Sequence, residues 1–377
     1  MGKILIFTAS TGGGHNQAAS SLGREFSQKG YKVKKIDILK ETSKILEILI
    51  EDGYKVLINR LPKIYGKLYK ISDKQRINKY ITRLFTKACY SKIYQIIKSY
   101  SPDLIISTHP FIINIIDRIK CEGLLKTPFI SIVTDYEAHQ TYISNKVDAY
   151  ITANKYTANS LIKKGVDKSK VYPFGIPIER KFLEKPPKQI INDNSKFRIL
   201  LMGGSLGMRN MKKVLNYLIK NNNPLEIIVV CGKNDVLKRS IEKNFIKKYS
   251  DKKLVVYGFT KKIHELMELC DVIITKPGGL TISEAIVKNI PIIIPYLIPG
   301  QEQENAQFLV KSGVAIKVDK AKEINSIIDC LINNPEKLEK MKLNMKKLSC
   351  QYSIEKIIEL GEYFILRNKN NKRVINK

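Results

Sequence analysis

The stretch KILIFTASTGGGH, residues 3–15, decides the fold of the first half of the chain. The apolar run from Ile4 to Thr8 is typical of a buried strand, and three glycines and His15 follow it shortly afterwards. Glycine at a strand-to-helix turn lets backbone N–H groups approach a ligand, and the helix N-terminus behind it carries partial positive charge. The stretch therefore predicts an α/β unit whose first turn faces an anion or another polar ligand.

The alternation of strand and helix patterns continues along the chain. Further strands are expected at 33–38, 104–108, 129–134 and 149–152, and then at 199–202, 226–231, 254–257, 272–275 and 292–295. Helical patterns lie between them, which is typical of parallel sheets covered on both faces. Since 377 residues exceed the usual size of one domain, we expect an α/β protein with two doubly wound, Rossmann-like lobes and a cleft between them.

A Pro- and Asn-rich break at 185–195 places the linker between the lobes. We expect an N-terminal lobe over 1–188, a C-terminal lobe over 197–350, and a helix over 351–366 that braces the first lobe. The Lys- and Asn-rich tail, 367–377, has little to bury and is expected to be disordered.

Composition limits the class of partner. The formal net charge of +31 is diffuse and predicts attraction to something anionic, but no nucleic-acid recognition motif accompanies it. The six cysteines show no C-x-x-C spacing, as expected of reduced thiols in a cytosolic protein. No segment reaches the roughly 18 apolar residues of a membrane span. The sequence predicts a soluble or peripheral protein that binds no nucleic acid.

Residues 55–98 are strongly basic, with twelve Lys or Arg against one acid, Asp73. Ile64, Leu68 and Ile71 recur at helical spacing within this stretch. Basic, apolar and tyrosine side chains together suit a helix that rests on anionic lipid. The alternative is an ordinary amphipathic helix with a solvated basic face. The candidate membrane contacts are Lys63, Tyr65, Lys67 and Tyr69.

Two common nucleotide motifs are excluded by spacing. In the first glycine turn, Gln17 stands where a dinucleotide fold requires its third glycine. Neither Gly66-Lys67 nor Gly232-Lys233 has the upstream glycine and following hydroxyl of a P-loop. NAD and ATP are therefore not favoured.

The second lobe has three glycine turns, 203–208, 258–259 and 276–281, each after a predicted strand. Open α/β sheets bind ligands at this edge. Backbone amides, the hydroxyls of Ser205 and Thr281 and a helix N-terminus are suited to a diphosphate, and Glu284 to ribose hydroxyls. One such turn often needs glycine for geometry alone, but three in one lobe favour a nucleotide.

Five motifs carry a resemblance: STGGGHNQAA at 10–19, TDYEAH at 134–139, GGSLGM at 203–208, KPGGLTISEA at 276–285 and GQEQENA at 300–306. In these the chain resembles the diacylglycerol glycosyltransferases of glycosyltransferase family 28, which include bacterial processive diacylglycerol β-glucosyltransferases and plant monogalactosyldiacylglycerol synthases. The similarity runs from about residue 3 to residue 365. It implies a GT-B fold, a UDP-sugar donor in the second lobe, and a diacylglycerol acceptor on the first lobe at the inner face of the cell membrane.

The resemblance assigns the donor residues one by one. The backbone around Phe259 would bind uracil, Glu284 the ribose, and Gln301 and Glu302 the sugar hydroxyls. The resemblance gives the diphosphate to Ser205, Gly278, Gly279 and Thr281, and it adds Gly204 to the donor-binding residues.

On the acceptor side, His15 is the candidate base, with Asp135 in support. An unperturbed imidazole has a pKa of about 6.5 and accepts a proton near neutral pH. Asp135 as the base, His139, and a His15 that only orients its turn remain alternatives. Many relatives carry a tryptophan just after the segment at 134–139, whereas here Tyr142 stands near that position and the chain has no tryptophan. Tyr142 is the candidate for the corresponding stacking or interfacial role. The further acceptor or membrane candidates are Gly13, Gly14, His139 and Tyr142.

No D-x-D pair is present to hold a metal at the phosphates, so we expect transfer without metal or cofactor. Glucose is the expected hexose, with galactose as the second choice, and the number and linkage of sugars stay open, as does the oligomeric state. The alternatives are an N-acetylglucosamine transferase with a polyprenyl-linked acceptor, a UDP-sugar epimerase, and a lipid-surface binding module without activity.

Overall fold

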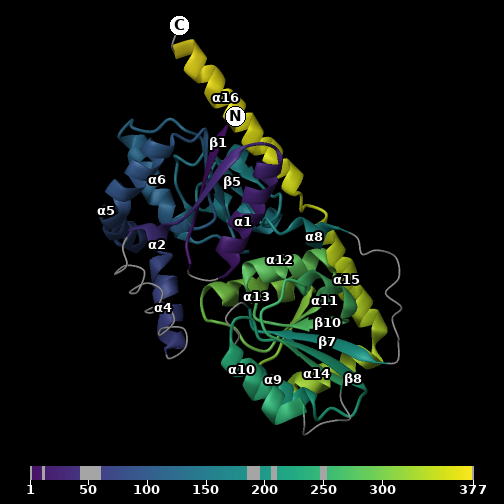
Figure 1. Ribbon diagram of the computed structural model, residues 1–377. Coiled ribbons are helices and arrows are strands. Elements are labelled where there is room, and N and C mark those ends of the chain that lie inside the picture. The colour runs from purple at the N-terminus through teal and green to yellow at the C-terminus, as the bar shows by residue number, and fades with distance from the viewer. Residues whose placement is uncertain are drawn as a thin grey trace. The chain divides into compact units, whose positions relative to one another are not determined.

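The computed structural model describes residues 2–10, 13–42, 61–184, 196–204, 210–246 and 253–375. The chain forms two compact units, drawn in Figure 1. The first unit comprises Met1–Glu179, Pro299–Gln301 and Gln351–Lys377, and the second comprises Arg180–Ile298 and Glu302–Cys350. The expected linker at 185–195 lies outside the described residues.

The first unit is built on a six-stranded parallel sheet of order β2-β1-β3-β4-β5-β6. Its strands are β1 Lys3–Thr8, β2 Lys32–Asp37, β3 Leu104–Ser107, β4 Phe129–Ile132, β5 Ala149–Ile151 and β6 Val171–Tyr172. Its helices are α1 Gly13–Gln28, α2 Ile38–Thr42, α4 Pro62–Ser72, α5 Gln75–Tyr100, α6 Ile113–Cys121, α7 Lys155–Lys163 and α16 Ile354–Ile375, with short turns η1 Pro110–Ile112, η2 Gln140–Tyr142 and η3 Lys168–Lys170. Because β1 lies between β2 and β3, the strand order reverses between β1 and β3, and such a switch point is where open sheets bind ligands.

The second unit repeats the plan with the order β12-β11-β10-β7-β8-β9, again all parallel. Its strands are β7 Phe197–Met202, β8 Leu225–Val230, β9 Lys253–Tyr257, β10 Val272–Ile274, β11 Ile292–Ile294 and β12 Ala315–Lys317. Its helices are α8 Arg180–Leu183, α9 Asn210–Leu218, α10 Asp235–Ile241, α11 Ile263–Leu269, α12 Gly279–Val287, α13 Gln301–Lys311, α14 Ile324–Asn333 and α15 Pro335–Ser349, with the π-helical turn η4 Glu242–Ile246 and the 3₁₀ turn η5 Ala321–Glu323. Here the switch point lies between β7 and β10.

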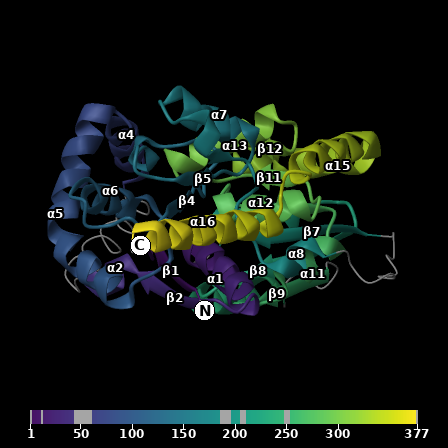
Figure 2. The ribbon, with the colours of Figure 1, turned by 90° about the horizontal axis from the view of Figure 1, so that it is seen from above.

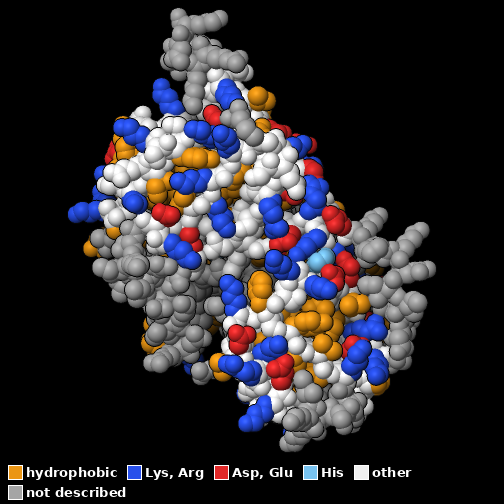
Figure 3. Space-filling model, in the orientation of Figure 1, with side chains coloured by type: hydrophobic (Ala, Val, Ile, Leu, Met, Phe, Trp, Pro, Cys, Tyr) orange, Lys and Arg blue, Asp and Glu red, His pale blue; other side chains and the backbone are white. Residues whose placement is uncertain are grey.

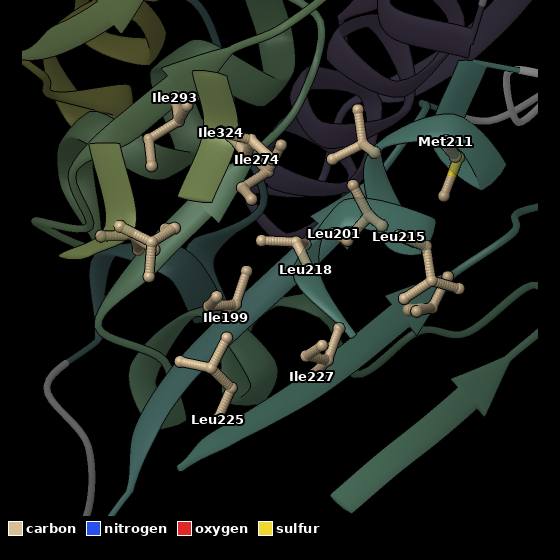
Figure 4. Packing of buried hydrophobic residues seen from close by; sticks show 14 of the residues in the cluster. Ile199, Leu201, Met211, Leu215, Leu218, Leu225, Ile227, Ile274, Ile293 and Ile324 are labelled. Atoms are coloured by element: carbon tan, nitrogen blue, oxygen red, sulfur yellow. The ribbon is translucent and has the colours of Figure 1, made fainter. Parts of the chain in front are cut away.

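The core of the second unit shows why its strands read as continuous apolar runs. Ile199 and Leu201 of β7 and Ile227 of β8 are fully buried, and they point toward Leu215 and Leu218 of α9 (Figure 4). Helices cover both faces of a parallel sheet, so neither face of a central strand needs polar residues. The predicted fold class is confirmed in both units.

The edge strands β6 and β12 were not expected from the sequence. They hold only two and three residues and are partly exposed. A run this short carries too little apolar pattern to be separated from a turn.

The expected disorder of the tail is wrong as far as Ile375, because α16 continues to that residue. α16 packs against α1 and β3, and Figures 1 and 2 both show it beside α1. Asn368 is buried, and its amide donates to the carbonyl oxygen of Asp103 at 3.3 Å. Asn368 lies one turn beyond the buried Phe364, so it extends the packed face of the helix past the buried apolar pair Phe364 and Ile365.

Lys and Arg side chains are spread over the visible face of both units, with acidic side chains among them (Figure 3). This dispersal agrees with the diffuse charge inferred from composition. Among the described residues, no helix is both long and apolar enough to cross a membrane.

Candidate functional site

His15 lies at the switch point of the first unit. It stands in the first turn of α1, the first helix after β1, and Thr108 directly follows the neighbouring strand β3. The Thr108 hydroxyl donates to the carbonyl oxygen of His15 at 3.0 Å. Two segments far apart in the sequence therefore fix the backbone of the candidate base.

The hydrogen bonds of the imidazole define its reactive atom. His15 Nδ1 lies 2.7 Å from the carbonyl oxygen of Thr108 and 3.0 Å from the hydroxyl oxygen of Thr134. A carbonyl oxygen only accepts hydrogen bonds, so Nδ1 carries the proton of the neutral ring. Nε2 is then left with its lone pair, and it is the atom able to accept a proton from a substrate hydroxyl.

The surroundings of His15 favour the neutral form of the ring over the charged form. Burial lowers the pKa of His15, while the charge of Asp135 and the bond to Thr108 raise it by smaller amounts. The ring of His109 meets it edge to face, with centroids 4.5 Å apart. Burial, and then the neighbouring His15, hold the pKa of His109 well below its ordinary value. Asp135 thus acts on His15 through its charge, while Thr108 orients the ring.

A lowered pKa leaves His15 unprotonated at pH values where a free imidazole is already charged. We therefore expect kcat/KM to fall on the acid side with a midpoint below about 6.5. Initial rates from pH 5 to about 8 at constant ionic strength measure this midpoint. A midpoint above that of a free imidazole would contradict the role of burial at His15.

His139 uses both ring nitrogens within the first unit. The backbone N–H of Thr141 donates to its Nδ1 at 3.2 Å, so Nε2 carries the proton and faces the carbonyl oxygen of Tyr69 at 3.3 Å. Asp73 accepts from the backbone N–H of Gln140 at 2.7 Å and forms an ion pair with Lys164. These contacts fasten the C-terminal end of α4 and engage both ring nitrogens of His139, whereas Nε2 of His15 keeps its lone pair.

Tyr142, a candidate acceptor or membrane contact, is buried in the first unit. Only 2% of the residue is exposed, because η2 turns the ring into the core of the first unit. Its hydroxyl lies 3.4 Å from the hydroxyl of Thr134, and burial raises its pKa. The hydroxyl of Tyr142 therefore lies beside Thr134, the residue next to His15, and its role as an acceptor or membrane contact stays a prediction.

The helix α4 carries an exposed apolar stripe, formed by Leu61, Ile64, Leu68 and Ile71. Each of these side chains is between 43% and 49% exposed. Lys63 and Lys67 are exposed beside the stripe, while Tyr65 and Tyr69 are half-buried. Figure 1 shows α4 extending from the start of α5 away from the sheet of the first unit.

The second unit gathers its glycine turns at its own switch point. Gly203 and Gly204 follow β7, while Gly278 follows the neighbouring β10 and is the N-cap of α12. Because its N-cap residue is a glycine, this helix start receives no capping bond from the side chain of that residue. Gly279 opens the helix, Thr281 is half-buried in its first turn, and Glu284 is buried one turn further on. Ser205 lies outside the described residues.

The other donor candidates lie on turns after further strands. Phe259 follows β9 and is 62% exposed, with the ammonium of Lys233 at 5.9 Å from its ring centroid. Gln301 and Glu302 begin α13, and Glu302 is buried. On the acceptor side, the candidates Gly13 and Gly14 are the first two residues of α1 in the first unit.

One residue of the donor turns was missed by the sequence interpretation. Lys276 directly follows Thr275 at the end of β10, and its ammonium forms an ion pair with Glu302. The second carboxylate oxygen of Glu302 accepts from the backbone N–H of Ile298 at 2.9 Å. Asn305 donates to the carbonyl oxygen of Pro277 at 3.0 Å, which ties α13 to the same turn. The available signal was a lysine between a buried strand and two glycines.

Family models match both halves of the chain. Residues 15–178 match monogalactosyldiacylglycerol (MGDG) synthase, and residues 198–357 match the glycosyltransferase family 28 C-terminal domain. The chain is 32% identical to the processive diacylglycerol beta-glucosyltransferase of Bacillus licheniformis, over 99% of this chain and 98% of that protein. The chain belongs to the diacylglycerol glycosyltransferase family. The enzyme of the same name from Bacillus subtilis is 30% identical, with the same coverage of both chains.

Solved structures show that this chain has the GT-B glycosyltransferase fold. Acinetobacter baumannii MurG matches 96% of this chain and 99% of its own, with a TM-score of 0.64 and 16% identity. Staphylococcus aureus MnaA bound to UDP matches 97% of both chains, with a TM-score of 0.61 and 14% identity. Anabaena HepE in complex with UDP-glucose matches 98% of this chain and 100% of its own, with a TM-score of 0.53 and 14% identity. These matches confirm the predicted fold, and the family confirms a glycosyltransferase.

Proposed function

We propose that the protein transfers a hexosyl group, glucose in the first place, from a UDP-sugar to diacylglycerol at a membrane surface. The observation that carries the proposal is the near full-length match to diacylglycerol beta-glucosyltransferases. The hydrogen-bonded state of His15, which leaves Nε2 as a base in the matched MGDG synthase region, supports it.

In the proposed mechanism, Nε2 of His15 takes the proton of the acceptor hydroxyl as its oxygen bonds to the anomeric carbon. The bond from that carbon to the β-phosphate oxygen breaks, and the electron pair leaves with UDP. Attack from the face opposite UDP inverts the anomeric carbon. Asp135 stabilises the imidazolium that forms, since its charge already favours protonation of His15.

Negative charge builds on the diphosphate during this step. The start of α12, whose N-cap is Gly278, and the glycine backbone of the second unit's switch point offer N–H dipoles to it. Such fixed dipoles stabilise the developing charge without reorganisation. Glu284, Gln301 and Glu302 then bind ribose and sugar hydroxyls, and the backbone near Phe259 binds the base. No metal or cofactor is part of this proposal, because the sequence lacks a D-x-D pair to hold one.

We propose that the apolar stripe of α4 inserts into the interfacial region of the cytoplasmic leaflet. Lys63 and Lys67 of the same helix would then contact anionic headgroups. Four exposed apolar side chains on one helix face are unusual at a water-facing surface. Each lysine near an anionic surface adds about 1 kcal/mol of attraction. The half-buried Tyr65 and Tyr69 lie on the same helix and complete an interfacial composition.

Two aspartates in the apolar stripe should detach the protein from vesicles. Ile64→Asp with Leu68→Asp removes two apolar side chains worth about 1.5–3 kcal/mol each on full burial, and it adds repelled charge. We expect vesicle affinity in a sedimentation assay to fall at least about tenfold, because the lost apolar burial exceeds the roughly 1.4 kcal/mol that corresponds to a factor of ten. Leu343→Asp, at a 55% exposed position of α15, is the matched control. Equal binding of the two variants would contradict membrane insertion by α4.

Donor and acceptor are tested together with purified protein, diacylglycerol vesicles and radiolabelled UDP-sugars supplied singly. We expect label from UDP-glucose in the lipid phase, with less from UDP-galactose. Consumption of UDP-N-acetylglucosamine without any glucolipid would reject the proposal. Conversion of the UDP-sugar in the absence of lipid would instead indicate an epimerase. Lipids that carry more than one hexose would indicate extension of the first product.

A further inference from the structure

The ammonium of Lys276 lies among the groups that face the diphosphate in the proposed function. Lys276 follows β10 at the switch point of the second unit, two residues before the N-cap of α12. The family comparison and the glycine motifs give this lysine no role. Its position, partners and exposure are specific enough to assign one.

The path of the side chain is defined by two glycines. A Cβ on Gly204 would lie 2.9 Å from Cε of Lys276, so the lysine stem runs directly over the backbone of Gly204. A Cβ on Gly278 would lie 3.6 Å from Nζ, so the ammonium sits beside the N-cap of α12. Gly204 has a φ of +75°, which L side chains rarely adopt. The turn after β7 is therefore shaped to let the cation approach the helix start.

Lys276 differs from the structural lysine at the other end of α12. Lys288 forms an ion pair with Glu268 and is 5% exposed, so its charge is sealed within the unit. Lys276 pairs with Glu302 but keeps 26% of its side chain exposed. Glu302 itself is 8% exposed and is also held by the N–H of Ile298. The carboxylate thus anchors a cation that lies beside the N-cap of α12 and whose side chain stays partly exposed.

We propose that Lys276 is a catalytic residue that binds the diphosphate of the UDP-sugar and stabilises UDP as it leaves, with Glu302 as its positioning residue. This inference rests on the proposed function. A diphosphate diester carries two negative charges, and breakage of the bond to the sugar leaves the electron pair, and one more charge, on UDP. Because the attraction grows as that bond breaks, Lys276 favours the transition state over the ground state.

The assignment also changes the role expected for Glu302. One of its oxygens contacts the ammonium of Lys276 and the other accepts from Ile298. Binding of a sugar hydroxyl by Glu302 would therefore occur beside the cation. Glu302 would then contact the sugar and also hold the ammonium of Lys276 in position next to the leaving diphosphate.

Calorimetry with UDP and with uridine tests the proposal. In the Lys276→Met variant we expect UDP affinity to fall about 10- to 100-fold, the loss of one charge-assisted contact, while uridine affinity stays that of the parent. Lys276→Arg should recover most of the UDP affinity. Lys317→Met removes an equally charged lysine that pairs with the exposed Asp319, and it should leave both affinities unchanged.

The outcomes separate this inference from the proposed function. A parent protein that binds no UDP would reject the proposed function. A parent that binds UDP, with a Lys276→Met variant that keeps full preference for UDP over uridine, would overturn the role of Lys276 alone. If Lys276→Met loses uridine binding and unfolds, Lys276→Gln, which keeps a polar head for Glu302, takes its place with the same expectations.

Kinetics supply a second readout. A group that acts on the leaving diphosphate lowers kcat when removed, whereas a merely structural lysine lowers the amount of folded enzyme. We expect kcat per folded Lys276→Gln molecule to fall at least tenfold, roughly the loss of one charged contact in the transition state. An unchanged kcat with only a lower melting temperature would overturn the catalytic role.

Discussion

His15→Ala is expected to lower the rate of sugar transfer by about 10²- to 10⁴-fold, the range for removal of a general base. The variant loses the Nε2 lone pair, while the UDP-binding turns of the second unit keep all their residues. We therefore expect UDP affinity and vesicle binding to match those of the parent. Radiolabel transfer to diacylglycerol, calorimetry with UDP and vesicle sedimentation give the three values.

The matched control is His264→Ala, which removes a histidine at the start of α11 in the second unit. Its transfer rate should equal that of the parent. If His15→Ala also kept the parental rate, His15 would not be the base, and Asp135 would be the next residue to test. A parallel loss of UDP affinity in His15→Ala would show that the variant disturbs more than proton transfer.

The second large effect is expected from Glu284→Ala, which should weaken UDP binding by about 10²-fold or more. Glu284 is buried on α12, one turn behind the glycines that face the diphosphate. Hydrogen bonds from ribose hydroxyls to a carboxylate are worth about 1.5–3 kcal/mol each. Calorimetric titration with UDP measures the loss.

A ligand without ribose hydroxyls makes this prediction specific. A UDP analogue that lacks both hydroxyls should bind the parent and Glu284→Ala with equal affinity, because the contact is absent from both complexes. Glu336→Ala, at an exposed acid in the first turn of α15, controls for the change in net charge. If the variant weakened UDP and the analogue equally, Glu284 would support the helix rather than bind ribose.

The sequence predicted the central strands well because they are buried on both faces. Strands such as β1 and β8 are nearly continuous runs of apolar residues and are bounded by turn residues. The edge strands β6 and β12 escaped prediction since pairing with one neighbour, and not an apolar pattern, defines them. The extension of α16 escaped for a similar reason: the buried Asn368 is polar, and only its tertiary partner Asp103 explains its place.

Candidate residues in the glycine turns were found because glycine marks a close approach of backbone to ligand. What the sequence did not show was how distant residues act on them. The proton position on His15 depends on Thr108, which lies 93 residues away in the chain. The core position of Tyr142 and the ion pair of Lys276 with Glu302 likewise depend on packing between separate elements. Local pattern selects such residues, and tertiary contacts define their chemistry.

The most direct test of the account is the structure of the lipid product. Purified protein, UDP-glucose and diacylglycerol vesicles are incubated together, and the lipid fraction is examined by mass spectrometry and proton NMR while UDP is quantified. The account predicts a β-linked glucosyl diacylglycerol, and one UDP released for each glucose transferred. UDP release without any glycolipid, or a glycolipid of α configuration, would contradict it.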